Sequence, residues 1–446
     1  CADVSKENQL QTGCSEGSES TPENEYVSPA PSTPDTTAPT ISSVSPSNGA
    51  TSISVSSDIT ITFSEAMDSS TINATNITVA DSSGNAVGGV VSYNSNVATF
   101  NPSSDLSYSK SYTITVSTGV KDSAGNALGS SSNRNFTTID LPTAISSGAN
   151  STCAILSDKT VKCWGATGGG QLGDNVNSST SVPVSISGIS TAISISSNGV
   201  SSCTLLSDKT VKCWGENVYG KLGDGTTTYR STPVTVSSIS DVITVGNATY
   251  HSCALLSNNT VKCWGNNDWG QLGDGSTTSS TTPVTVSGIS NATAITVSKN
   301  RHTCVLLSDN SVKCWGLNTY GQLGDNSTTN RTTPVTVSGI STAIAVTGGR
   351  SHTCALLSNS TVQCWGYNYY GQLGNGSTIL QDQQRTTPVT VSGISNATAI
   401  SAGDYHNCAL LSSNTVQCWG SNGAGQLGNG TSGYSSSRST PVTVQF

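Results

Sequence analysis

The stretch HTCALLSNSTVQCWG, residues His352–Gly366, decides the fold of this chain. Two cysteines enclose a short apolar run, a polar turn and a second run with a β-branched residue. This pattern predicts a β-hairpin, and residues directly opposite each other on its strands are close enough to form a disulfide. Five near-copies of the stretch occur elsewhere in the 446 residues. We therefore predict six disulfides, one in each copy: Cys153–Cys163, Cys203–Cys213, Cys253–Cys263, Cys304–Cys314, Cys354–Cys364 and Cys408–Cys418.

Other uses of these cysteines fit their spacing less well. Zinc sites favour ligand pairs roughly two to four residues apart, whereas nine residues separate the members of each pair here. The chain has no haem-attachment motif, and buried reduced thiols remain the alternative to disulfides. Six disulfides would indicate an oxidising, extracytoplasmic compartment. Each would stabilise the fold by roughly 2–3 kcal/mol, and by less where the hairpin already forms in the unfolded chain.

The repeats follow a regular period. Their first cysteines stand at positions 153, 203, 253, 304, 354 and 408, so the steps are 50, 50, 51, 50 and 54 residues. Periods of this size are typical of propellers and solenoids. Each unit reads as four short strands, for example TAIAVTGG, HTCALLS, TVQCWG and TTPVTV, which is the strand number of a propeller blade. Residues 141–446 are therefore predicted to form an all-β propeller of six repeats.

The phrases VxCWG, NxYGQLGD and PVTV resemble the regulator of chromosome condensation repeat family over all of residues 141–446. The resemblance implies a β-propeller, which in this family most often has seven blades. Six units favour six blades here, and a seventh blade without a visible repeat is the alternative. Nuclear members act in nucleotide exchange and chromatin docking. A disulfide-bearing chain of net charge −8 fits better with extracytoplasmic relatives, such as propeller-type β-lactamase inhibitors, which bind proteins through one face of the ring.

Residues 38–140 have a different pattern. Apolar and polar residues alternate in ISVSSDITITF and SYTITV, as in the half-buried strands of a β-sandwich. The phrases FSEAMD and GVKDSAGN resemble bacterial Ig-like domains, which usually serve as spacers or adhesion modules. Glu65, Asp68 and Asp122 offer the oxygen ligands that calcium prefers, but we favour a role for them in capping turns.

The start of the chain resembles a mature bacterial lipoprotein. The first residue is Cys1, and a polar segment rich in Ser, Pro, Glu and Thr follows it. The resemblance implies a lipid on Cys1, and Ala2 is compatible with sorting to the outer membrane. An arbitrary boundary of the given sequence is the alternative. Residues 1–37 cannot bury a core and are predicted to be a disordered tether. Cys14 is either a free thiol or pairs with another chain.

No catalytic chemistry is apparent in the sequence. It contains neither a nucleophile elbow nor a phosphate-binding loop. His251, His302, His352 and His406 occupy one fixed place in the repeat, so we interpret them as structural. We therefore predict a protein that is not an enzyme and has no metal, no cofactor and no membrane-spanning segment. The net charge of −8 argues against a nucleic-acid partner.

Binding is expected where the repeats differ, in two sets of loops. The loops before QLG or KLG carry an aromatic residue in units two to five: Tyr219, Trp269, Tyr320 and Tyr370. The loops before the histidine position carry Tyr250, Arg301, Arg350 and Tyr405. Aromatic residues and arginine dominate interface hot spots, so we predict that these loops bind a protein or a glycan. The alternatives are that the aromatics pack on neighbouring blades, or that the propeller is a structural coat or filament component. Unit five also has an insertion, residues 379–384, and the sequence sets no oligomeric state.

Overall fold

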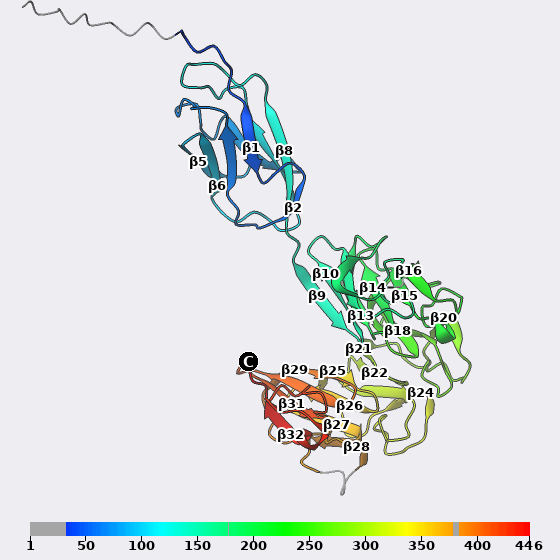
Figure 1. Cartoon of the computed structure of the whole chain (residues 1–446). Helices are drawn as coiled ribbons and strands as arrows, with labels where there is room; N and C mark the ends of the chain where they lie inside the picture. The colour runs from blue at the N-terminus through cyan, green and yellow to red at the C-terminus, as the bar shows by residue number, and fades with distance from the viewer. Residues whose placement is uncertain (1–32, 177, 378–382) are drawn as a thin grey trace, which may run out of the picture. The chain divides into compact units, whose positions relative to one another are not determined.

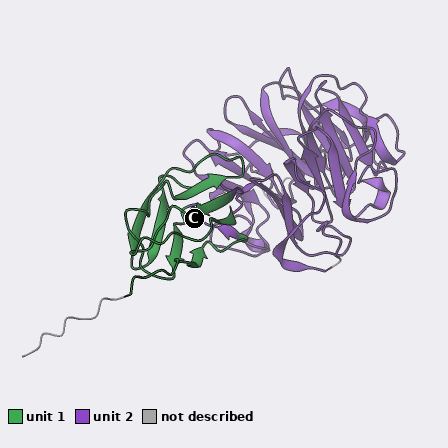
Figure 2. Cartoon of the chain, turned by 90° about the horizontal axis from the view of Figure 1, so that it is seen from above, with its two compact units in different colours: residues 1–50, 56–105, 112–136 green, residues 51–55, 106–111, 137–446 purple. Residues whose placement is uncertain are grey.

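The computed structural model describes residues 33–176, 178–377 and 383–446. Cys1, Cys14, most of the predicted tether and most of the unit-five insertion lie outside these residues. Chain contacts divide the protein into two compact units, of which the second contains all residues from Thr137 onward (Figure 2). The described residues form strands and two short 3-10 turns, η1 (Val218–Gly220) and η2 (Tyr434–Ser436). None of their helices is long and apolar enough to cross a membrane.

The N-terminal region contains two four-stranded sheets. One sheet has the order β1 (Ile41–Ser45), β3 (Ile59–Phe63), β6 (Val97–Pro102) and β5 (Gly89–Asn94). The other has the order β2 (Ala50–Ile53), β8 (Ser132–Thr138), β7 (Ser111–Val116) and β4 (Ile77–Asp81). The predicted alternation is present: Ile59, Ile61 and Phe63 are buried along β3. Two sheets with one buried face each are the architecture of a β-sandwich.

The repeat region contains six four-stranded sheets, each built from four strands that follow one another in the chain. We call them blades one to six, in chain order. Blade one has β9 (Pro142–Ser147), β10 (Ser151–Leu156), β11 (Val161–Gly165) and β12 (Thr180–Ser185). Blade two has β13 (Ala192–Ser197), β14 (Ser201–Leu206), β15 (Val211–Gly215) and β16 (Arg230–Thr235). Blade three has β17 (Val242–Asn247), β18 (His251–Leu256), β19 (Val261–Gly265) and β20 (Ser280–Thr285).

Blades four to six repeat the same pattern (Figure 1). Blade four has β21 (Ala292–Val297), β22 (His302–Leu307), β23 (Val312–Gly316) and β24 (Arg331–Thr336). Blade five has β25 (Ala343–Gly348), β26 (His352–Leu357), β27 (Val362–Tyr367) and β28 (Gln384–Thr390). Blade six has β29 (Ala397–Ala402), β30 (His406–Leu411), β31 (Val416–Gly420) and β32 (Arg438–Thr443). Residues of all six blades line one hollow, so the blades surround a common axis. The prediction of four strands per blade is confirmed.

The cysteine pairs join the second and third strands of each blade. Cys304 lies directly opposite Cys314 in the antiparallel ladder, and the other five pairs have the same register. All six predicted disulfides are present. Disulfides form and persist in oxidising compartments. The six bonds therefore indicate an extracytoplasmic environment.

Adjacent blades are joined by the tryptophans of the CWG phrase. In blades two to six the indole is fully buried, and its Nε1 donates a hydrogen bond to a backbone carbonyl of the preceding blade; for Trp315 and Gln271 the distance is 2.9 Å. A Cβ on Gly273 would lie 2.7 Å from this indole, so the glycine of QLG leaves the space that the tryptophan fills. Each core cluster of the repeat region draws its residues from two neighbouring blades. The tryptophans of the CWG phrase therefore pack adjacent blades against each other.

Candidate functional site

The two sets of variable loops meet on one face of the repeat region. Tyr370, in a loop before QLG, and Tyr405, in a loop before a histidine, have ring centroids 5.3 Å apart. Tyr320 contacts the same group through Tyr367, at 4.7 Å. Sequence reasoning did not establish that the two loop sets share a face; the structure brings three of their members together.

We call the resulting group the tyrosine cluster. It comes from blades four, five and six and comprises Tyr320, Tyr367, Tyr369, Tyr370, Tyr405 and Tyr434. Three of these residues were not predicted: Tyr367, Tyr369 and Tyr434. The phrase YNYYG in unit five did carry a signal, because it has three tyrosines where the equivalent loops of the other units have at most one aromatic residue. Tyr434 precedes β32 and could be placed only by the fold.

Two phenols of the cluster, Tyr367 and Tyr405, are held in the neutral form. Burial, assisted by the neighbouring phenols, raises the pKa of Tyr367 to about 12. Burial also raises the pKa of Tyr405, although Arg350 acts in the opposite direction. A neutral phenol both donates and accepts hydrogen bonds. Tyr369, Tyr370 and Tyr434 also line a surface hollow of 340 Å³ together with three serines. This part of the surface therefore combines flat aromatic rings with hydroxyl groups.

Two of the predicted loop aromatics lie outside the tyrosine cluster. Tyr219 and Trp269 are exposed in blades two and three, as predicted for binding residues. However, no ring contact within the described residues joins them to the tyrosine cluster. Tyr250 instead contacts a cation, because the guanidinium of Arg301 lies 4.2 Å from its ring centroid. The guanidinium of Arg350 lies 5.8 Å from the ring centroid of Tyr405.

An axial pocket of 380 Å³ opens beside these loops. Its lining comes from the loop between the first and second strands of every blade and from the adjoining strand ends, and it includes Asn198, Tyr250, Lys299, Arg350, Asp404 and His406. Lys299 and Arg350 bring two positive charges to the pocket, and Asp404 brings one negative charge. The predicted residues Tyr250 and Arg350 therefore share this hollow with Lys299, which the sequence analysis did not select.

The cations of these loops differ from other basic residues of the repeat region. Arg230 and Arg331 form ion pairs with aspartates at 2.6 and 2.7 Å. In the part of the chain that the structure describes, Lys299, Arg301 and Arg350 form none. The Nε of Arg301 is buried and has no hydrogen-bond partner. Unpaired charge on an acidic protein is available to an anionic group of a partner.

The repeated histidines lie between blades and have the structural place predicted for them. His251, His302 and His352 are fully buried, and each Nε2 pairs with a side chain of the next blade at 2.7–3.0 Å. Burial lowers the pKa of His251 and His302 to about 3 and that of His352 to about 4. These imidazoles are neutral at physiological pH and join blades rather than forming one site.

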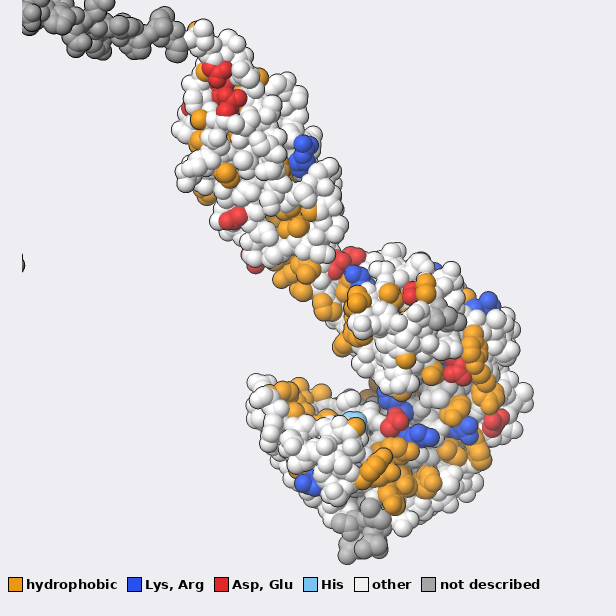
Figure 3. Space-filling model, viewed as in Figure 1, with side chains coloured by type: hydrophobic (Ala, Val, Ile, Leu, Met, Phe, Trp, Pro, Cys, Tyr) orange, Lys and Arg blue, Asp and Glu red, His pale blue; other side chains and the backbone are white. Residues whose placement is uncertain are grey.

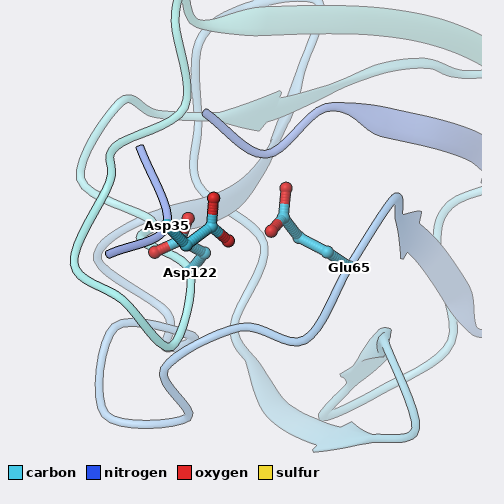
Figure 4. A group of neighbouring side chains, drawn as sticks. All are labelled: Asp35, Glu65 and Asp122. Atoms are coloured by element: carbon cyan, nitrogen blue, oxygen red, sulfur yellow. The ribbon is translucent and has the colours of Figure 1, made fainter. Parts of the chain in front are cut away.

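Three carboxylates form a separate group in the N-terminal unit (Figure 4). Ligand atoms of Asp35, Glu65 and Asp122 all lie within 4.8 Å of one another. Burial, followed by repulsion from the two aspartates, raises the pKa of Glu65. Asp122 already accepts hydrogen bonds from Asn126 and the following turn, and Asp68 accepts them from Ser70. These bonds agree with the turn-capping interpretation of the two aspartates, and an acidic cluster alone does not establish a calcium site.

Comparisons with known proteins agree with this architecture. The bacterial Ig-like domain family matches residues 35–138. One model of the regulator of chromosome condensation (RCC1) repeat matches residues 210–255, 259–306, 309–356 and 361–410. A second RCC1 repeat model matches residues 143–171, 245–271, 294–322, 343–372 and 397–426.

The solved structures that match this fold include proteins from yeast and human. Yeast RCC1 (Prp20), crystallised with Kap60, is 19% identical at a TM-score of 0.60, and the match covers 68% of this chain and 74% of that chain. Prp20p from Saccharomyces cerevisiae is 19% identical at a TM-score of 0.59, over 68% of this chain and 76% of that one. Human WBSCR16 is 20% identical at a TM-score of 0.61, over 72% and 86%. The family matches establish that the chain is a bacterial Ig-like domain followed by a β-propeller of the RCC1 repeat family.

Proposed function

We propose that this chain is a lipid-anchored cell-surface protein whose propeller face binds a protein or glycan partner. The observation that carries the proposal is the tyrosine cluster, where loops of three blades bring six phenol rings together, with the guanidinium of Arg350 beside Tyr405. Lys299 and Arg301 lie in the equivalent loop of blade four. Tyrosine and arginine supply large contact area with polar groups at their ends, which is the composition of interface hot spots. Because the three cations have no carboxylate partner in the described chain, the partner is expected to present acidic groups.

The proposed location depends on two features. Six disulfides support an extracytoplasmic site. Lipidation of Cys1 would hold the chain at the outer membrane, with residues 1–37 as tether, residues 38–140 as Ig-like spacer and residues 141–446 as a six-bladed head. Acyl chains supply membrane affinity without a spanning helix. Mass spectrometry of the native N-terminal peptide tests this part; an unmodified Cys1 on protein taken from its membrane would rule out the anchor.

Protein binding by other propellers supports the choice of function class. Prp20p was characterised for binding to Gsp1p and histones, and yeast RCC1 was crystallised with Kap60 bound. We do not transfer those partners to this chain. We propose a binding role without catalysis. A structural coat or filament component without a discrete ligand is the second candidate, favoured by the repeated, disulfide-linked blades.

Capture experiments separate the two candidates. The full-length protein is used to capture partners from whole cells and culture supernatant, and the double variant Tyr370→Ala with Tyr405→Ala is used alongside it. We expect the double variant to lose capture while its melting temperature stays close to that of the wild type. Tyr229→Ala is the matched control, because Tyr229 is exposed but lies outside the cluster. Capture that survives the double variant would remove the tyrosine cluster as the site, and self-assembly without capture would favour the coat component.

A further inference from the structure

A surface hollow between blades five and six is lined only by uncharged residues. It has a volume of 340 Å³, and its lining consists of one glycine together with Tyr369, Tyr370, Tyr434, Ser435, Ser437 and Ser439. We call it the tyrosine hollow. The space-filling view shows hydrophobic side chains, a class that includes tyrosine, gathered over β27 and β28 of blade five (Figure 3). Pockets for small ligands have volumes of roughly 300–1,000 Å³, so the tyrosine hollow has room for a small ligand or for the end of a longer one.

An insertion in blade six builds one wall of the tyrosine hollow. Arg438 and Arg331 have the same place in their blades, since each pairs with the glycine of the CWG phrase. The loop before this arginine spans nine positions from Asn429 to Arg438, but only six from Asp325 to Arg331 in blade four. The difference accommodates η2, which carries Tyr434. The tyrosine hollow is therefore a feature of one blade and not of the repeat.

Hydrogen bonds and close packing hold the walls of the tyrosine hollow in place. The Nδ2 of Asn422 donates to the hydroxyl of Ser436 in η2 at 2.9 Å, and the backbone N–H of Asn422 donates to Ser437 Oγ at 3.3 Å. On the side of blade five, a Cβ on Gly371 would lie 2.6 Å from the Cα of Ser439, so the glycine lets its loop lie directly against β32. Walls that are fixed in this way lose little conformational freedom when a ligand binds.

Three tyrosine rings line the tyrosine hollow at different angles. Tyr369 and Tyr370 meet edge to face, with centroids 5.0 Å apart and planes at 81°. Tyr370 and Tyr434 are inclined at 28°, with centroids 6.3 Å apart. The Tyr434 ring lies against the backbone of Gly423, where a Cβ would be 3.0 Å from the ring. Even so, Tyr434 is 75% exposed and Tyr369 is 40% exposed. These rings therefore leave aromatic surface that a ligand can cover.

The polar groups of the tyrosine hollow are hydroxyls. Within the described residues, the side chains of Ser435 and Ser439 and the three phenol hydroxyls make no hydrogen bond. No charged side chain lines the hollow, in contrast to the axial pocket. A charged ligand would lose water here without gaining an opposite charge. An aliphatic ligand would cover the hydroxyls without offering them a hydrogen bond. The lining therefore favours a neutral ligand that combines an apolar face with several hydroxyls.

We propose that the tyrosine hollow binds a neutral saccharide, with a pyranose ring of the saccharide against the exposed face of Tyr434. A pyranose carries C–H bonds on its faces and hydroxyls around its rim. The C–H bonds meet the electron-rich face of the aromatic ring, and the rim hydroxyls exchange hydrogen bonds with Ser435, Ser439 and the phenols. The inference rests on the proposed function, because it names a glycan as the partner of the propeller face.

Saccharide binding by the full-length protein tests the proposal directly. The probes are neutral oligosaccharides of glucose, galactose, mannose and N-acetylglucosamine, with sulfated and sialylated oligosaccharides for comparison. Saturation-transfer difference NMR and titration measure binding at low and at high ionic strength. We expect at least one neutral probe to bind through its ring C–H groups with an affinity that does not depend on salt. The proposal fails when no neutral probe binds, or when the affinity falls as the salt concentration rises.

Substitutions at Tyr434 locate the binding. Tyr434→Ala removes the ring and should weaken the affinity about tenfold, whereas Tyr434→Phe keeps the ring and should weaken it by about threefold. Tyr229→Ala is the matched control, because Tyr229 is 49% exposed outside the tyrosine hollow, and it should bind like the wild type. Melting temperatures should stay close together, since both positions are exposed. Unchanged affinity of Tyr434→Ala would overturn the proposal.

Capture from cells separates this inference from the proposed function. The cells are treated with periodate, which cleaves the vicinal diols of sugars, before the wild-type protein is used to capture partners. Loss of capture after the treatment supports a saccharide. Capture that survives the treatment, but not the double variant Tyr370→Ala with Tyr405→Ala, would overturn the saccharide and leave a protein-binding face in place. The absence of both capture and saccharide binding would remove the proposed function as well.

Discussion

The blade junctions of the propeller keep the same residue types from repeat to repeat, whereas the surface loops do not. At the junctions, the same residue types recur at the same positions: Trp315 and His302 have counterparts in most blades, with the same partners. In the loops, residues such as Tyr367, Tyr369 and Tyr434 occur once and gather over blades five and six. A residue at a buried junction must fit the residue that it contacts in the adjacent blade, so the same residue type recurs in successive repeats. A loop position faces solvent and is free to diverge, which is where a specific partner can be recognised.

The largest effect on stability is expected in a comparison of two tryptophans, one at a junction and one in a loop. Trp315→Ala removes a fully buried indole and its hydrogen bond to Gln271, and we expect it to lower the free energy of unfolding by about 3–5 kcal/mol. Trp269→Ala removes an exposed loop indole and should change it by no more than about 0.5 kcal/mol. Urea titrations of both variants measure the difference. Equal losses would mean that Trp269 is a packing residue and that the loop residues also stabilise the fold.

The junction histidines predict sensitivity to acid. Burial holds the pKa of His302 at about 3, below its ordinary value of 6.5, so the unfolded chain takes up a proton first as the pH falls. The stability that depends on neutral His302 is fully present above about pH 6.5 and is lost progressively as the pH falls toward 3, by about 2 kcal/mol at pH 5. In His302→Gln, stability should fall less steeply between pH 7 and pH 5 than in the wild type. Parallel pH profiles of the two proteins would contradict the prediction.

Each disulfide should contribute a similar amount. Replacing both Cys304 and Cys314 by alanine opens a hairpin loop and should lower stability by about 2 kcal/mol, because the loop is short and the hairpin is local. The fold itself should persist, since strands β22 and β23 still pair in the ladder. Denaturant titration measures the loss, and thiol counting under denaturing, non-reducing conditions checks the other five bonds. Ten or more free thiols in the wild type would exclude them.

The smallest effect is expected at one loop residue. Tyr219 has φ 68°, in the left-handed region that disfavours a bulky side chain. Asn is tolerated better in that region, so Tyr219→Asn should raise stability by about 0.5–1 kcal/mol. Tyr320 occupies the equivalent loop place without a positive φ, and Tyr320→Asn should give no such gain. A difference in melting temperature between the two variants measures the effect. Equal shifts would show that the left-handed backbone conformation of Tyr219 does not lower the stability of the fold.

Local features of the fold were predictable because they depend on residues close in sequence. The spacing of Cys304 and Cys314 is sufficient to place them opposite each other on one hairpin, whatever the rest of the chain does. The period and the fixed place of Trp315 indicated blades and their packing. The structure supplies what the period itself does not contain: which residue of the next blade each indole and imidazole meets.

The candidate site was less predictable because it depends on distances between loops of different blades. Tyr370 and Tyr405 are 35 residues apart in the sequence, yet their rings lie 5.3 Å apart. No sequence pattern distinguishes Lys299, and it becomes a candidate binding residue only because it lines the axial pocket. The partial exposure of Trp164 and the 41% exposure of Leu410 were equally hidden, because both residues have the same local sequence as their buried counterparts. Exposure there follows from position in the ring and not from residue type.

The glycine that faces each tryptophan has an evolutionary consequence. Gly273 and Trp315 belong to neighbouring blades, and the same pairing connects every internal junction. Because each junction is made by equivalent residues of adjacent repeats, in-frame duplication or deletion of a whole repeat rejoins matching partners and leaves no misfit at the new boundary. A gene of this kind is therefore able to change its number of repeats by unequal recombination, while point changes at the glycine or the tryptophan are selected against in every copy.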